Sequence, residues 1–242
     1  MMFGEHDFLD RFPAARDAGF EAVEFLFPYQ FSPEEIARSL TENDLAISVF
    51  NLYPGEWDKG DRGLAALADR KAEFRSTIQR AIPYARSSGA KQLHVMAGIA
   101  DPSHETVGVY IENIRFAADA LAAEGLDLLI EPINRRSMPG YFLSKTAQAL
   151  DLMDRIDHPA VKLQFDIFHH QITAGDVLKT MSACKEQIGH IQIAGVPDRH
   201  EPDTGELNYA EIFRHIDNIA YSGWVGCEYV PRNGTKAGLD WL

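Results

Sequence analysis

The chain of 242 residues contains only two cysteines, no long apolar run and far fewer basic than acidic side chains. Cys184 and Cys227 are 43 residues apart and form no CxxC motif, so we expect two reduced thiols and no disulfide framework. No stretch reaches the roughly 18 apolar residues typical of a membrane span. The start, MMFGEHDF, lacks the basic region and apolar core of a signal peptide. These absences predict a cytoplasmic protein with no membrane partner.

The shortage of basic residues argues against nucleic acid as a binding partner. With 23 Lys and Arg against 36 Asp and Glu, the formal net charge is −13, whereas binding to phosphate backbones needs clusters of basic side chains. We therefore expect no nucleic-acid partner. A negatively charged substrate would have to be attracted by a local positive group or by a metal ion.

The length and composition fit one domain that spans residues 1–242. The hydrophobic fraction of 45% and the charged fraction of 24% are ordinary for a globular protein. Strand-like apolar runs alternate with amphipathic helical stretches, which is typical of α/β units. The seven clearest strand-like runs are 21–27, 46–52, 91–98, 127–133, 161–168, 189–195 and 223–230.

This alternation predicts a TIM (β/α)8 barrel whose first strand is truncated or missing. A full barrel needs an eighth strand before the helix expected at roughly 5–18, and only Met1, Met2 and Phe3 remain for it. Ser32, a good N-cap, followed by Pro33 at the first helical position, predicts the start of a later helix.

Four polar side chains come late in four successive strand-like runs. They are Glu131 in LLIEPIN, Asp166 in LQFDIFH, Gln192 in HIQIAG and Glu228 in VGCEYVP, spaced by 35, 26 and 36 residues. In a parallel barrel, all four point into the mouth at the carboxyl ends of the strands, where such barrels place their active sites. Buried carboxylates repel one another unless a cation holds them. Oxygen ligands favour a hard ion, so the quartet predicts a Mg²⁺ or Mn²⁺ site.

Side chains of a strand alternate between its two faces, so the quartet also assigns its neighbours. The residues two positions earlier should point into the barrel one layer deeper, and those between should face the helices. Three residues of earlier strands are expected to look into the barrel in the same way. The deeper layer is Leu129, Gln164, His190 and Gly226, and the three earlier residues are Glu24, Asn51 and His94.

At these residues the chain resembles the hydroxypyruvate isomerase family of the xylose-isomerase-like TIM-barrel superfamily. The segments that carry the resemblance extend over essentially the whole chain. They are GFEAVEFLFPY, EPIN, GYFLSKTAQAL, LQFDIFHHQI, GHIQIAGVPDRHEPDTGELNY, GWVGCEYVP and GTKAGLDWL.

The resemblance implies roles for individual residues. Glu131, Asp166, Gln192 and Glu228 match the metal-ligand positions, and the two glutamates also match the pair that donates and accepts protons. His169 matches a histidine that contacts substrate in related sugar epimerases.

Two more residues are expected to bind substrate. Arg199 lies one residue beyond the position of a substrate-contacting arginine, so its transfer from the family is less direct. Arg135 and Arg136 are alternatives for pairing with a substrate carboxylate. His94 is included because it faces into the barrel.

The reaction that the resemblance implies interconverts hydroxypyruvate and tartronate semialdehyde (2-hydroxy-3-oxopropanoate). A proton moves between adjacent carbons through an enediolate, which the metal ion stabilises, while one glutamate removes a proton and the other delivers one. The resemblance also implies a homo-oligomer.

Other functions stay open at this point. A 2-oxo-tetronate isomerase or a ketose epimerase would use the same machinery, although related ketose 3-epimerases have histidine where this chain has Gln192. The endonuclease IV class shares the barrel but uses several zinc ions and a basic DNA-binding face. A barrel that only binds a metal or a sugar acid is the remaining alternative.

Overall fold

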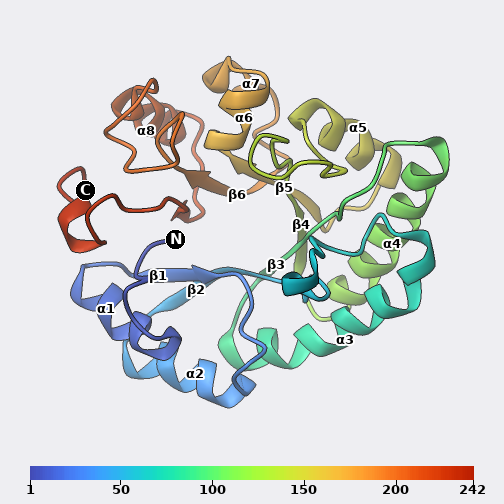
Figure 1. The fold of residues 1–242 in the computed structure, drawn as a ribbon, viewed down its shortest axis with the longest axis horizontal. Helices are drawn as coiled ribbons and strands as arrows, with labels where there is room; N and C mark the ends of the chain where they lie inside the picture. The colour runs from blue at the N-terminus through green and yellow to red at the C-terminus, as the bar shows by residue number, and fades with distance from the viewer.

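The computed structural model describes residues 1–242 as a ring of parallel strands surrounded by helices (Figure 1). The strands form one sheet in chain order, and each pairs in parallel with the next. The predicted TIM-barrel fold is confirmed, with seven strands. They are β1 (Ala22–Phe25), β2 (Ala46–Asn51), β3 (Gln92–Val95), β4 (Asp127–Ile130), β5 (Val161–Asp166), β6 (Ile188–Ile193) and β7 (Val225–Cys227).

Eight α-helices lie on the outside of this sheet (Figure 1). None of them is both long enough and apolar enough to cross a membrane. The helices are α1 (Arg11–Asp17), α2 (Pro33–Glu42), α3 (Lys71–Ser88), α4 (His104–Ala122), α5 (Thr146–Ile156), α6 (Ile167–Thr173), α7 (Val177–Ala183) and α8 (Tyr209–Asn218).

The start of α2 forms as its sequence predicts. Ser32 accepts a hydrogen bond from the backbone N–H of Glu35, and the Glu35 carboxylate accepts one from the backbone N–H of Ser32. This reciprocal capping box satisfies two amide groups that a helix leaves without partners. Pro33 occupies the first helical position, where its missing N–H costs nothing.

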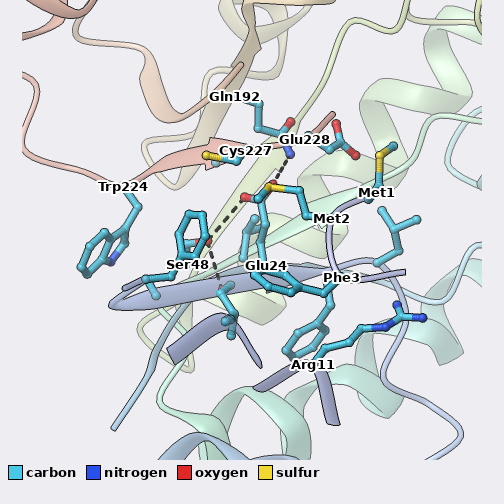
Figure 2. A pocket seen from close by; sticks show the side chains of 18 of the residues that line it. Met1, Met2, Phe3, Arg11, Glu24, Ser48, Gln192, Trp224, Cys227 and Glu228 are labelled. Carbon is cyan, nitrogen blue, oxygen red and sulfur yellow. Dashed lines mark hydrogen bonds between the residues drawn. The ribbon is translucent and has the colours of Figure 1, made fainter. Parts of the chain in front are cut away.

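The barrel is not closed by backbone pairing between β7 and β1, which are the two ends of the sheet. A cavity of about 460 Å³ lies there, lined mostly by apolar side chains (Figure 2). Residues 1–3 line this cavity in a turn and form no strand. The stub of a first strand that these residues could have formed is therefore absent.

Most of the predicted strands are shorter than the apolar runs that indicated them. The run 127–133 pairs only as far as Ile130, and the run 223–230 forms a strand only over Val225–Cys227. Glu131 and Glu228 thus follow their strands instead of ending them. The backbone of Glu228 still contacts the sheet, because its N–H donates to the Ile193 carbonyl of β6 at 3.1 Å.

The predicted alternation of inward and outward side chains is confirmed in β5 and β6. Gln164 and Gln192 contact each other inside the barrel, whereas the intervening Phe165 and Ile191 lie in the apolar core beneath the helices. Phe165 is only 1% exposed. Its packing against the helices holds β5 in the register that directs Asp166 into the mouth.

Replacing Phe165 with alanine should therefore destabilise the whole barrel. The loss of a buried phenyl ring costs about 3–5 kcal/mol in unfolding free energy. Phe116→Ala is the matched control: Phe116 is 36% exposed, so its loss should cost about 1 kcal/mol or less. Urea unfolding followed by circular dichroism measures both values, and equal costs would contradict the assignment of Phe165 to the core.

Candidate active site at the mouth of the barrel

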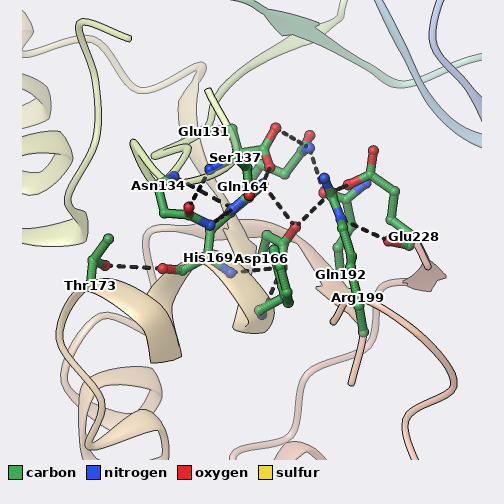
Figure 3. Close-up of polar contacts among 12 residues, drawn as sticks. Glu131, Asn134, Ser137, Gln164, Asp166, His169, Thr173, Gln192, Arg199 and Glu228 are labelled. Atoms are coloured by element: carbon green, nitrogen blue, oxygen red, sulfur yellow. Dashed lines mark hydrogen bonds and ion pairs between the residues drawn. The ribbon is translucent and has the colours of Figure 1, made fainter. Parts of the chain in front are cut away.

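The four residues predicted as metal ligands converge at the carboxyl ends of the strands (Figure 3). Glu131 follows β4, Asp166 ends β5, Gln192 lies in β6 and Glu228 follows β7. Glu131, Asp166 and Gln192 are 3–5% exposed, and the Glu228 side chain is 13% exposed. The structure therefore brings together the quartet that the spacing of the strands indicated.

Asp166 is held by the helix that begins beside it. As the N-cap of α6, it accepts hydrogen bonds on Oδ1 from the backbone N–H groups of Phe168 (2.7 Å) and His169 (3.3 Å). Such capping orients the carboxylate and satisfies the free amides of the first turn. Its other oxygen, Oδ2, is left facing the mouth.

Glu131 has an unsatisfied oxygen that faces the same space. Its Oε2 accepts a hydrogen bond from Gln164 Nε2 at 3.1 Å, whereas its buried Oε1 has no hydrogen-bond partner. Ligand atoms of Glu131, Asp166 and His169 lie within 4.8 Å of one another. A buried, unpaired carboxylate oxygen next to a second carboxylate is a site that a small hard cation fits.

His169 is better suited to donate a hydrogen bond in this cluster than to bind a metal. Its Nδ1 lies 2.6 Å from Asn134 Nδ2, and the orientation of that amide is set because Asn134 Oδ1 accepts the Ser137 N–H. Two N–H groups of Asn134, from the side chain and the backbone, therefore point at Nδ1. In the neutral ring the proton then lies on Nε2, which faces Glu131 and Asp166 at 3.7 and 3.5 Å.

Arg199 supplies the positive charge of the site. Its Nη2 lies 2.6 Å from Glu228 Oε2 and 3.4 Å from Asp166 Oδ2, and its Nε donates to the Glu228 carbonyl. The backbone of Arg199 has a φ of 59°. A non-glycine residue in this region carries about 1–3 kcal/mol of strain, which is typical of functional sites. The loop after β6 thus holds the guanidinium directly over two carboxylates.

The remaining residues that were predicted to bind substrate are His94, Arg135 and Arg136. His94 is 1% exposed, and its Nε2 lies 3.6 Å from Glu131 Oε2. Burial lowers the pKa of His94 to about 3, so its ring is neutral. Arg135 and Arg136 donate instead to the carbonyl oxygens of Tyr141 and Pro197.

Two further residues order the site. Asn134 sets the tautomer of His169, and Gln164 links Glu131 to Gln192. Alternation along the strand predicted that Gln164 faces into the barrel but gave it no role, and Asn134 was not singled out from the sequence. The position of Asn134 depends on the turn after β4, for which the EPIN segment was the only signal.

Burial dominates the electrostatics of the three carboxyl groups. It raises the pKa of Asp166 to about 6 and that of Glu228 to about 7, although Arg199 opposes both shifts. The pKa of Glu131 is raised well above its ordinary range by burial and by the charges of Glu228 and Asp166. The site therefore holds groups that can exchange protons near neutral pH.

Comparison with known proteins identifies the family. The model of the Xylose isomerase-like TIM barrel family matches residues 12–242. The chain belongs to this family. The 2-oxo-tetronate isomerase of Cupriavidus necator is 51% identical over 100% of this chain and 94% of its own length. The hydroxypyruvate isomerase of Escherichia coli is 44% identical over 100% of this chain and 95% of its own. The expected isomerase class is thereby confirmed.

Solved structures agree on the fold of this family member. A crystal structure described as AP endonuclease, family 2 from Brucella melitensis superposes with a TM-score of 0.97 at 45% identity, covering 99% of this chain and 94% of that one. A D-allulose 3-epimerase from Methylomonas sp. matches with a TM-score of 0.78 at 19% identity, over 94% of this chain and 80% of that one. The second match shows the fold alone.

The raised pKa of Glu228 predicts a pH-dependent stability in the metal-free protein. Folded Glu228 keeps its proton up to about pH 7, whereas its ordinary pKa is 4.5. Between these values the folded state binds more protons, so the unfolding free energy falls as the pH rises. Glu228→Gln lacks this titration, and its stability relative to the wild type should therefore increase from pH 4.5 to pH 7.5.

Unfolding in urea with EDTA present measures this difference at each pH. Glu186→Gln is the control, because Glu186 is exposed and far from the mouth, and its curve should run parallel to that of the wild type. A parallel curve for Glu228→Gln as well would contradict the proton uptake assigned to Glu228.

Proposed function

We propose that the protein interconverts hydroxypyruvate and tartronate semialdehyde as an aldose–ketose isomerase. The observation that carries this proposal is the facing pair Glu131 and Glu228, buried carboxyl groups with raised pKa values on opposite sides of one mouth. An isomerisation that moves hydrogen between adjacent carbons needs one group to remove a proton and another to deliver one. The isomerase relatives support the same reaction class.

The reaction requires only proton transfers. A base removes a proton from C3 of hydroxypyruvate, and the electrons of the C–H bond form the C2–C3 double bond of an enediolate. A proton then adds at C2, and the proton that the C3 hydroxyl gives up as the carbonyl forms at C3 is taken up by the C2 oxygen, which becomes the hydroxyl of the product. No oxidant or reductant is consumed, because the two carbons exchange oxidation states.

The chain supplies a group for each step. Glu131 and Glu228 follow β4 and β7, so they approach a substrate in the mouth from two sides. The Nε2–H of His169 is directed at the space between Glu131 and Asp166, where it can donate a hydrogen bond to a substrate oxygen. The guanidinium of Arg199 can pair with the substrate carboxylate, for which its planar fork is suited.

The site also fits a divalent cation. Glu131, Asp166, Gln192 and Glu228 would hold it, and their oxygen ligands favour Mg²⁺ or Mn²⁺. When bound, such an ion supplies Lewis-acid stabilisation of negative charge on the substrate oxygens. The unpaired Oε1 of Glu131 supports this assignment, because a buried carboxylate oxygen without a partner is costly.

A 2-oxo-tetronate is the second candidate substrate, favoured by the relative of that name at 51% identity. Both substrates are 3-hydroxy-2-oxo acids, and the carbonyl moves from C2 to C3 in each. They differ only in a hydroxymethyl group on C3. The ratio of kcat/KM for the two acids therefore decides between them without changing the proposed roles of the residues.

Other classes fit the site less well. A DNA-directed function would require basic groups at the mouth, whereas the formal net charge is −13 and three carboxyl groups line the site. A barrel that only binds would not need two facing, buried carboxyl groups whose pKa values are raised. Cytoplasmic location and a homo-oligomer stay predictions.

The glutamate pair gives a direct test of the proposed chemistry. Glu131→Gln and Glu228→Gln should each lower kcat by about 10²- to 10⁴-fold, because each amide can neither accept nor donate the transferred proton. Steady-state rates with hydroxypyruvate measure the effect, and circular dichroism checks the fold. Glu105→Gln, an exposed change on α4, should leave kcat unchanged. Near-normal turnover in either mouth variant would refute the pairing.

Arg199 is tested by its contribution to substrate binding. Arg199→Lys keeps the charge but loses the planar fork, so KM for hydroxypyruvate should rise about 10-fold or more, as loss of a charged hydrogen bond predicts. Arg136→Lys is the control, since Arg136 is exposed and bound to the Pro197 carbonyl. If KM rises more in Arg136→Lys than in Arg199→Lys, the contact with the substrate carboxylate would have to be assigned to Arg136 instead.

A further inference from the structure

We propose that Glu24 is a positioning residue that sets the orientation of the Gln192 carboxamide, so that its carbonyl oxygen serves the cation site. This inference rests on the proposed function, because it assigns a purpose to a residue that supports the quartet. Glu24 lies on β1, on the opposite side of the gap in the barrel from β7, and its side chain reaches across to β6 (Figure 2).

Both oxygens of the Glu24 carboxylate receive N–H groups from β6. Oε1 accepts from Gln192 Nε2 at 2.8 Å, and Oε2 lies 2.6 Å from His190 Nε2. The Glu24 side chain is 17% exposed, and that of His190 is fully buried. These contacts join β1 to β6 across the gap, where β7 and β1 share no backbone hydrogen bonds.

The hydrogen-bond network extends from Glu24 through Gln192 and Gln164 to Glu131, with a carboxylate acceptor at each end. Gln192 Oε1 accepts from Gln164 Nε2 at 2.7 Å, and the same Nε2 donates to Glu131 Oε2 at 3.1 Å. A carboxylate can only accept, whereas a carboxamide can turn either way. The acceptor at Glu24 therefore draws the NH2 group of Gln192 toward β1 and leaves its oxygen on the side of Gln164 and Glu131.

Gly226 on β7 leaves room for this arrangement. A Cβ atom at residue 226 would overlap the Glu24 carboxylate. The backbone of Gly226 has no positive φ that would require glycine, so space for the carboxylate is the constraint at this position. The carboxylate thus passes over β7 only because residue 226 has no side chain.

Replacing Glu24 with glutamine removes the directional constraint. The amide introduced by Glu24→Gln could donate to Gln192 Oε1, and the Gln192 amide could then turn its NH2 group toward the cation site. N–H groups repel a cation, and loss of an outer hydrogen-bond partner typically lowers metal affinity by about 10- to 100-fold. We therefore expect the Glu24→Gln variant to bind Mn²⁺ about 10-fold more weakly than the wild type.

The experiment measures Mn²⁺ affinity directly from the electron paramagnetic resonance signal of free Mn²⁺, without turnover. Asp166→Asn identifies the site, because it should abolish the binding seen in the wild type. Glu21→Gln is the matched control: Glu21 begins the same segment, is exposed and makes no contact with Gln192. Its affinity should equal that of the wild type.

A double-mutant cycle separates positioning from a general effect on the fold. In a Gln192→Ala background, Glu24→Gln should cause no further loss of affinity, because Glu24 acts through the Gln192 amide. A purely structural role would weaken binding equally in both backgrounds. If Glu24→Gln does not fold, Glu24→Asp gives a second test, since its shortened carboxylate should no longer reach Gln192 and should weaken binding in the same way.

The outcomes distinguish this inference from the proposed function. Wild-type binding with an unchanged affinity in folded Glu24→Gln, or an equal loss with and without Gln192, overturns the role of Glu24 and leaves the cation site intact. Absence of Mn²⁺ binding in the wild type overturns the cation site itself and the role of Glu24 with it. Weaker binding only when Gln192 is present supports the proposal.

Discussion

The structure depends on the burial of three carboxyl groups at one end of a barrel. Charges removed from water and placed beside like charges are unstable unless positive groups or protons compensate them. The chain provides Arg199 against Glu228 and Asp166, and burial raises the pKa of all three carboxyl groups, so that each binds a proton at higher pH than an exposed carboxyl group does. One oxygen of Glu131 is left unpaired. The excess of buried carboxyl groups over positive groups lowers the stability of the fold, and it also enables the mouth to hold a cation and to exchange protons.

The scaffold determines where this charge is placed. Strands of a parallel barrel all end at one rim, so residues at their ends meet although they are far apart in sequence. Local interactions then orient each group. Asp166 is fixed as the N-cap of α6, and Asn134 sets the tautomer of His169. The strained backbone of Arg199 holds its guanidinium over the mouth. Across the gap between β7 and β1, Glu24 extends this order to Gln192.

The positions of the mouth residues could be predicted from the sequence, because they follow from the alternation of side chains along each strand. The register that points Asp166 and Gln192 inward follows from alternation, and the spacing of the four residues follows from the length of a strand-plus-helix unit. The strand ends were predicted too long, since apolar letters continue into loops that leave the ladder, as after Ile130. The pairing of Asn134 with His169 depends on the geometry of a turn, which no periodicity encodes.

The most direct test of the central claim is the fate of hydrogen when the protein converts hydroxypyruvate in D₂O. Proton NMR at early times, with an enzyme-free control, follows the substrate and the tartronate semialdehyde. Proton transfer by the mouth carboxyl groups predicts deuterium from solvent at C2 of the product. Product that retains the substrate's own hydrogen at C2 would mean either that hydrogen moves as hydride or that a single shielded base returns the proton it removed, and both results would contradict the division of roles between Glu131 and Glu228.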